Sequence, residues 1–242
     1  MRLLLAFSLL LTLACQTTKS GVNVAIAANL LLPFEEIVAV YESETQAQIK
    51  LISGASGSLT AQIEKGAPFE VFVSANERYA QHLFEQDLAK GNPINLIEGQ
   101  LMLWRKSELD SLQTKTQLDP NIKIAIADPE LAPYGMAAKA YLDSLGVWEA
   151  FQPNIVFGKS VGQVNQYLFA GVVDYAFTAT AARAMDTLSS PHQWTSINSE
   201  VSLTHPFLLI KGASFEAERF VQYLQGETAR NVFLRHGYSL KP

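Results

Sequence analysis

The chain has 242 residues, of which 48% are apolar, and its 18 basic and 23 acidic residues give a formal net charge of −5. The apolar fraction supports a folded core, and the lack of a long basic tract argues against nucleic acid as a partner. Cys15 is the only cysteine, so the folded part has no disulfide and no cysteine metal ligand, and its stability depends on an ordinary hydrophobic core.

The N-terminus predicts an exported protein. Arg2 precedes an apolar run from Leu3 to Leu11, which is far shorter than the roughly 20 residues that a membrane-spanning helix needs. We therefore expect residues 1–14 to be a signal peptide and the mature protein to be periplasmic.

Cys15 follows this run, as the lipidated cysteine does in bacterial lipoproteins. The match is incomplete, because Thr12 occupies the position where such signals usually carry Leu. Lipidation at Cys15 and a freely soluble periplasmic protein are therefore both open.

From Gly21 onward, short β-branched runs alternate with stretches of helical periodicity, a pattern typical of α/β proteins with mainly parallel sheets. Strands are expected at 22–27, 49–52, 71–73, 101–104, 123–127, 155–157, 175–178 and 203–210. Helices are expected at 33–43, 59–65, 77–87, 136–145, 162–170, 215–225 and 227–236. Since no repeat or flexible linker interrupts this pattern, we expect two lobes that share chain crossings. Lobe I would comprise 22–103 with 204–242, and lobe II 104–203.

Four loops each follow an expected strand and precede an expected helix: 27–30, 53–58, 133–135 and 158–161. In open α/β sheets, ligands collect beyond the carboxyl ends of the strands, where helix N-termini present unpaired N–H groups and a partial positive charge. The four loops are therefore candidate anion-binding loops.

The polar side chains in these loops also have purely structural interpretations. Ser56 or Ser58 is suited to cap the helix that follows, Asn29 has the same option, and Tyr134 fits a turn. Only the coincidence of several such loops favours ligand binding.

The charges of these loops indicate what kind of anion they suit. The first two loops contain no Lys or Arg, and Lys159 in the fourth is expected to be a solvated charge at the rim. Neutral donors suit a fully deprotonated dianion, whereas a protonated anion such as hydrogen phosphate needs an acceptor for its proton. The nearest carboxylates are Glu35, Glu36 and Asp128, and we interpret Asp128 as a turn residue.

Enzyme chemistry finds no support in the sequence. The stretch 54–58 lacks the second glycine of a nucleophile elbow, and neither a phosphate-binding loop nor a dinucleotide fingerprint occurs. The histidines are scattered singly, so we expect each to be a surface or partly buried residue and not a metal ligand: His82, His192, His205 and His236. The sequence predicts a binding protein with no enzyme activity and no cofactor.

Taken together and in this order, the motifs give the mature chain a resemblance to the periplasmic molybdate-binding proteins of ABC transporters. The matching stretches are 27–30 with Pro33, 54–57, 62–75, 126–129, 132–135 and 237–238. The resemblance implies a type II periplasmic-binding fold, in which two α/β lobes joined by two crossings close on the ligand. It also implies a monomer that captures molybdate or tungstate and delivers it to a permease in the inner membrane.

The resemblance further implies which residues contact the oxyanion, with no direct protein ligand to the metal: Ala28, Asn29, Ser56, Tyr134 and Val161. One branch of the family has Ser in place of Asn29, a small residue in place of Tyr134 and Tyr in place of Thr178. This chain is similar to the other branch, which often carries Thr where Ala28 stands. Ala28 therefore lacks a hydroxyl donor, and a lost hydrogen bond to a charged group is worth roughly 1.5–3 kcal/mol. The hydroxyl of Thr178 is the candidate to replace this donor.

Three alternatives stay open at this point. The ligand is another oxyanion, such as sulfate, phosphate or an organic acid, if that ion alone shifts the melting temperature. An enzyme on the same fold would show turnover, and an interaction module that has lost its ligand would have lobes that never close.

Overall fold

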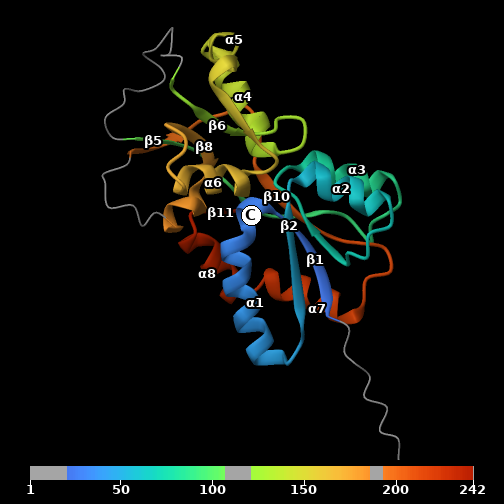
Figure 1. Cartoon of the computed structure of the whole chain (residues 1–242). Helices are drawn as coiled ribbons and strands as arrows, with labels where there is room; N and C mark the ends of the chain where they lie inside the picture. The colour runs from blue at the N-terminus through green and yellow to red at the C-terminus, as the bar shows by residue number, and fades with distance from the viewer. Residues whose placement is uncertain (1–20, 107–120, 186–192, 242) are drawn as a thin grey trace, which may run out of the picture.

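The structure is a computed structural model that describes residues 21–106, 121–185 and 193–241. The described chain forms two lobes, each built on its own β-sheet (Figure 1). The first sheet has the order β11-β4-β10-β3-β1-β2 and contains β1 (Val22–Ala27), β2 (Ile49–Gly54), β3 (Val71–Val73), β4 (Ile94–Glu98), β10 (Thr204–Leu209) and β11 (Ser239–Leu240). The second has the order β7-β6-β8-β5-β9 and contains β5 (Leu101–Arg105), β6 (Ile124–Ala127), β7 (Ile155–Gly158), β8 (Tyr175–Ala179) and β9 (Gln193–Ile197).

The first sheet is covered by helices on both faces. One face carries α1 (Leu31–Thr45), α7 (Phe215–Leu224) and α8 (Glu227–Arg235), and the other carries α2 (Ser56–Glu64) and α3 (Glu77–Glu85). Alternate residues of β1 pack against the helices on opposite faces of the sheet, because successive side chains of a strand point to opposite faces. Ile26 packs in the cluster with Phe34 of α1, and Ala25 packs in the cluster with Leu59 of α2. The apolar run of β1 is therefore that of a central, doubly covered strand.

The second sheet is built in the same way. Helices α4 (Pro133–Ser144) and α5 (Trp148–Phe151) lie on one face, and α6 (Val161–Phe169) lies on the other. Phe177 of β8 packs in the cluster with α4, whereas Ala176 packs with Val164 and Leu168 of α6. Short 3-10 turns complete the described elements: η1 (Ala28–Leu30), η3 (Gln152–Asn154) and η4 (Thr180–Met185).

The chain crosses between the sheets from β4 to β5 and returns from β9 to β10. The two crossings contact each other, since the Gly99 N–H donates to the Leu203 carbonyl at 2.9 Å. The expected boundary between 103 and 104 falls inside β5, whose five residues all pair in the second sheet. An apolar strand pattern does not reveal which sheet the strand joins, so the sequence placed this crossing too late. The expected return at 203–204 coincides with the start of β10.

The expected strands and helices all occur, with ends shifted by up to a few residues, and the α/β class is confirmed. The mainly parallel pairing was wrong in part: β10 runs antiparallel to β3 and β4, and β5 runs antiparallel to β8 and β9. The short elements β4, β9, β11 and α5 were not predicted from the sequence. β9 and β11 are edge strands, β4 is half exposed, and α5 is a single helical turn. Their hydrophobic patterns are too short to be recognised in the sequence.

Candidate functional site

All four candidate loops converge on one small cavity between the lobes. The space open to the centre of a water molecule is about 10 Å³, enough for roughly one water-sized sphere. Its lining contains Ala27, Ala28, Asn29, Gly54, Ala55, Ser56, Ala75, Ala132, Pro133, Tyr134, Ser160 and Val161. The five residues that the resemblance singles out are all in this wall, two loops being contributed by each lobe.

The first loop comes from the carboxyl end of the central strand β1. The chain turns through η1 directly into α1, so Ala28 and Asn29 lie at the amino end of the helix that follows. Neither acts as a side-chain cap: Leu30 precedes α1, and no side-chain cap hydrogen bond is present at its start. The capping interpretation of Asn29 therefore does not hold, and its side chain is available for another role.

The second loop joins β2 to α2. Ser56 is the first residue of α2 and is buried, and Ala55, without a side-chain cap, precedes it. The Ser56 hydroxyl oxygen accepts from the backbone N–H of Ala75 at 3.0 Å, which fixes the hydroxyl group and leaves its own hydrogen to donate. The first N–H groups of a helix have no intrahelical acceptor. The amino end of α2 therefore offers both a side-chain hydroxyl and backbone N–H groups as donors.

The third loop joins β6 to α4 and belongs to the other lobe. Pro133 occupies the first turn of α4, where its missing N–H costs nothing. Tyr134 follows and is buried, and its hydroxyl lies 3.5 Å from the Asn29 amide nitrogen across the lobe boundary. Burial, with the neighbouring Tyr238 as a second cause, raises the Tyr134 pKa well above its ordinary value. The hydroxyl is therefore protonated at neutral pH and able to donate.

The fourth loop joins β7 to α6. Ser160 precedes α6 without a side-chain cap hydrogen bond, and Val161 is its first residue. The backbone N–H of Val161 thus lies at a helix amino end that also lines the cavity. A Cβ on Gly162 would lie 3.4 Å from the Ala28 Cβ, so the two lobes are in van der Waals range here.

The lobes are also hydrogen-bonded beside the cavity. The backbone N–H of Gly57 in α2 donates to the carbonyl of Leu131, in the loop before α4, at 2.9 Å. Together with the Tyr134 and Gly162 contacts, this bond shows that the two lobes meet directly beside the cavity.

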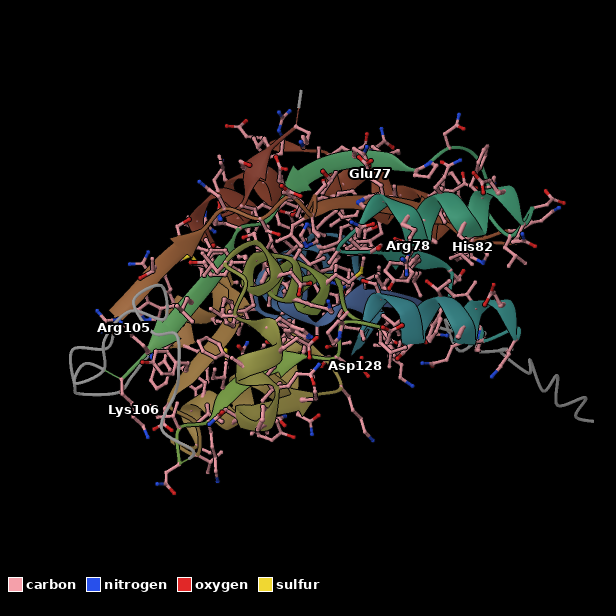
Figure 2. The ribbon with its side chains drawn as sticks, turned by 90° about the horizontal axis from the view of Figure 1, so that it is seen from above. Glu77, Arg78, His82, Arg105, Lys106 and Asp128 are labelled. Atoms are coloured by element: carbon pink, nitrogen blue, oxygen red, sulfur yellow. The ribbon has the colours of Figure 1, made fainter. Side chains whose placement is uncertain are left out.

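No charged side chain lines the cavity among the residues that the structure describes. Asp128 accepts from the backbone N–H of Glu130 at 2.9 Å, which confirms its role as a turn residue (Figure 2). Glu36 pairs with Arg235 and with His236 on the outside of lobe I. Lys159 is exposed and lines a larger neighbouring groove of about 600 Å³.

Arg78, Arg105 and Lys106 do not line the cavity. Arg78 lies over the ring of Tyr79 on α3, with 4.9 Å from its guanidinium carbon to the ring centroid. Arg105 and Lys106 lie at the opposite end of the molecule from α3 (Figure 2), where Lys106 pairs with Asp174 at 2.8 Å. The cavity therefore presents neutral donors and partial charges of helix ends.

Thr178 is placed differently from the five lining residues. It is buried in β8, and its hydroxyl donates to the Asn165 side-chain oxygen of α6. It does not belong to the cavity wall. The proposed replacement of the missing hydroxyl at Ala28 by Thr178 thus gains no support from its position.

Sequence reasoning missed three residues behind the cavity: Gly99, His205 and Tyr238. His205 is wholly buried, which corrects the expectation of a surface or partly buried residue, whereas His82 is exposed and pairs with Glu64 at 2.7 Å. Of these residues, the sequence pointed only to Tyr238, through the matching stretch 237–238. His205 is a lone histidine in an apolar strand and forms no recognisable pattern. His192 and Cys15 lie outside the described residues.

The described part of the chain contains no cluster of three or more His, Cys, Asp or Glu side chains that suits a metal ion. None of its helices combines the length and apolar character that crossing a bilayer would require.

Comparison with known families adds an independent observation. Residues 22–239 match the family model described as bacterial extracellular solute-binding protein. The molybdate-binding protein ModA of Azotobacter vinelandii is 31% identical over 95% of this chain and 94% of its own length. The molybdate-binding protein ModA of Rhodobacter capsulatus is 35% identical over 72% of this chain and 70% of its own.

Solved structures show the same architecture. The periplasmic molybdate-binding protein of Azotobacter vinelandii superposes with a TM-score of 0.82 at 29% identity, covering 91% of this chain and all of that one. The sulfate-binding protein SubI of Mycobacterium tuberculosis reaches a TM-score of 0.72 at 13% identity over 90% of this chain and 86% of its own, a likeness of fold alone. The expected two-lobed binding-protein fold is confirmed.

Proposed function

We propose that this chain, which belongs to the bacterial extracellular solute-binding proteins, captures molybdate or tungstate for uptake by an ABC transporter. The observation that carries the proposal is the small cavity between the lobes, walled by four helix-start loops with neutral donors and no charged side chain among the described residues. Helix amino ends stabilise an anion through their N–H groups and dipoles.

In this proposal the oxyanion is held from both lobes. Ser56 donates its hydroxyl hydrogen, while its oxygen stays engaged by the Ala75 N–H. Tyr134 donates from the opposite lobe, and Val161 donates its backbone N–H. Asn29 and the backbone beside Ala28 complete the contacts, and protein atoms contact the oxygens of the ion and never the metal centre.

The charge of the wall selects a fully deprotonated dianion. A protonated anion would bring a hydrogen that needs an acceptor, and no carboxylate lines the cavity in the described chain. Molybdate and tungstate are discriminated from sulfate by size, because donors set for the longer metal–oxygen bonds reach the smaller sulfate poorly.

The relatives supply the wider context of the proposal. We propose that the protein works as an extracytoplasmic monomer, catalyses no reaction, and delivers its ion to a permease in the inner membrane. Residues 1–14 would be removed on export, and Cys15 would carry the lipid if the protein is anchored. Incorporation of labelled palmitate in cells, compared between the native chain and Cys15→Ser, tests the anchor.

A thermal-shift titration tests the ligand. The chain without residues 1–15 keeps every residue that the structure describes, and it would be titrated separately with molybdate, tungstate, sulfate and phosphate. A ligand that binds only the folded state raises the free energy of unfolding by RT ln(1 + [L]/Kd). Molybdate at a hundred times its Kd should therefore raise the melting temperature by roughly 5–10 °C.

A rise with molybdate and tungstate alone supports the proposal. An equal rise with sulfate contradicts the size selection, and a rise with phosphate alone replaces the ligand. No rise with any of the four ions overturns the oxyanion-binding function itself.

A further inference from the structure

The side-chain amide of Asn29 lies against two buried side chains behind the cavity. Its nitrogen is 2.8 Å from His205 Nε2 and 2.8 Å from the Tyr238 hydroxyl oxygen. Tyr238 uses its own hydrogen to donate to the Asn29 backbone carbonyl at 2.8 Å, so it can only accept from the amide. These two short contacts take both hydrogens of the amide nitrogen, so its longer 3.5 Å contact with the Tyr134 hydroxyl can only share one of them. In this orientation the Asn29 side chain has no hydrogen left for an oxyanion.

The same orientation leaves two buried polar atoms unsatisfied. Asn29 Oδ1 and His205 Nδ1 have no hydrogen-bond partner within the described chain. Accepting at Nε2 requires that the neutral imidazole carry its hydrogen on Nδ1, where it finds no acceptor of normal geometry. An unsatisfied buried polar group costs free energy, and this pair contains both a donor and an acceptor without partners.

The charge state of His205 limits the possible arrangements. Burial lowers its pKa to about 3, and the nearby Leu203 carbonyl opposes this shift without making a regular hydrogen bond to Nδ1. The ring is therefore neutral at physiological pH and has one hydrogen, carried either by Nδ1 or by Nε2. Turning the amide over exchanges its nitrogen and oxygen within nearly the same volume.

We propose that His205 is a positioning residue for the oxyanion site: when an oxyanion occupies the cavity, His205 Nε2–H donates to Asn29 Oδ1 and holds the amide nitrogen toward the ion. The inference rests on the proposed function and deepens it. The imidazole loses the hydrogen on Nδ1 and gains one on Nε2, so no net proton is taken up or released. Asn29 Oδ1 gains His205 as a donor, and the Tyr238 hydroxyl, which no longer accepts from the amide, shares its hydrogen between Oδ1 and the Asn29 backbone carbonyl. Both amide hydrogens become available to the cavity.

The surroundings of His205 hold the ring in place for this role. It sits in β10 at the point where the pairing with β4 shifts register, next to Pro206. Its ring packs edge-on against Tyr238, with 5.4 Å between centroids. A Cβ on Gly99 would come within 2.8 Å of its Cε1, so the ring is confined from the crossing as well.

Nitrogen NMR of the imidazole rings tests the proposal directly. Protein labelled with 15N-histidine, lacking residues 1–15, would be measured alone and saturated with molybdate, since ring nitrogens with and without hydrogen differ widely in shift. His205 is assigned by comparison with His82→Gln, His192→Gln and His236→Gln. With molybdate bound, we expect the hydrogen of His205 on Nε2. A hydrogen on Nδ1 in the molybdate-saturated protein overturns the proposal.

A double-mutant cycle gives a second, independent test. His205→Leu removes the donor and should weaken molybdate binding about tenfold or more, whereas His205→Gln, which retains an N–H, should recover part of the loss. In the His205→Leu background, Asn29→Ala should cost much less affinity than in the native protein.

Additive losses in this cycle would show that His205 acts only on overall stability, and they would overturn the positioning role. Binding is measured by calorimetry on variants whose folding is checked by circular dichroism. If the native protein binds molybdate while the cycle is additive, only this inference fails. If the native protein binds no oxyanion, the proposed function fails and the inference with it.

Discussion

The two halves of the cavity wall are built differently. In lobe I, the polar side chains are held by groups of the same lobe: Ser56 by the Ala75 N–H, and Asn29 by His205 and Tyr238. In lobe II, the hydrogen-bond partner of the Tyr134 hydroxyl is Asn29, which belongs to lobe I. Lobe I therefore holds its polar side chains by its own groups before closure, with the Ser56 hydroxyl hydrogen already free to donate, whereas lobe II completes its part only when the lobes meet. On this account the ion docks on lobe I and lobe II closes over it.

The largest expected effect comes from breaking the contact of Tyr134 with the crossing. A Cβ on Gly99 would overlap the Tyr134 hydroxyl and press on His205. Overpacking of a closed site costs typically 1–3 kcal/mol, so Gly99→Ala should weaken molybdate binding by about 10- to 100-fold in calorimetric titration. Gly226→Ala, directly before α8 and outside the cavity wall, is the matched control. An unchanged affinity in Gly99→Ala would mean that Tyr134 is not needed at this position.

Removing a fixed donor of lobe I should have the next largest effect. Ser56→Ala loses the hydroxyl that faces the cavity and leaves the buried Ala75 N–H without its acceptor. We expect molybdate affinity to fall about tenfold or more and the protein to stay folded. Ser58→Ala, two residues further along α2 and outside the cavity wall, should bind normally. Equal affinities for both variants would return Ser56 to a structural role.

Adding a hydroxyl donor to the lobe I part of the cavity wall should strengthen binding. Ala28 lines the cavity but brings no hydroxyl, so Ala28→Thr should strengthen molybdate binding, by up to about tenfold for one charged hydrogen bond. Ala28→Val has the same branched shape without the donor and serves as the control. If Thr and Val behave alike, only the backbone N–H contributes at this position.

The smallest effect is expected at Thr178. Its hydroxyl is engaged by Asn165 and does not face the cavity, so Thr178→Val should leave molybdate affinity within about twofold and cost about 1 kcal/mol of stability. Urea unfolding and calorimetry on the same preparation separate the two effects. A marked loss of affinity would give Thr178 the compensating role that the sequence comparison suggested.

The sequence predicts the half of the site that follows from strand-loop-helix order. The four loops were found because small and polar residues follow apolar strands, and the structure brings all of them to one cavity. The residues behind that wall were not found: Gly99 looks like any loop glycine, and His205 is a single polar residue in an apolar strand. Their roles come from long-range packing between the crossing, β10 and the C-terminus, which no local pattern records. The register shift beside Pro206 is equally invisible without the partner strand.

If neutral donors hold a fully deprotonated dianion, binding at neutral pH takes up no proton, and calorimetric proton counting measures this. Molybdate would be titrated at about pH 7 in buffers of different ionisation enthalpy, which reveals any proton taken up on binding. Tyr134, whose pKa is raised, and His205, whose pKa is about 3, are both neutral there. We expect one site, no net proton uptake and little competition from sulfate. Uptake of about one proton per site, or equal competition by sulfate, would show that the dianion is not held in this way.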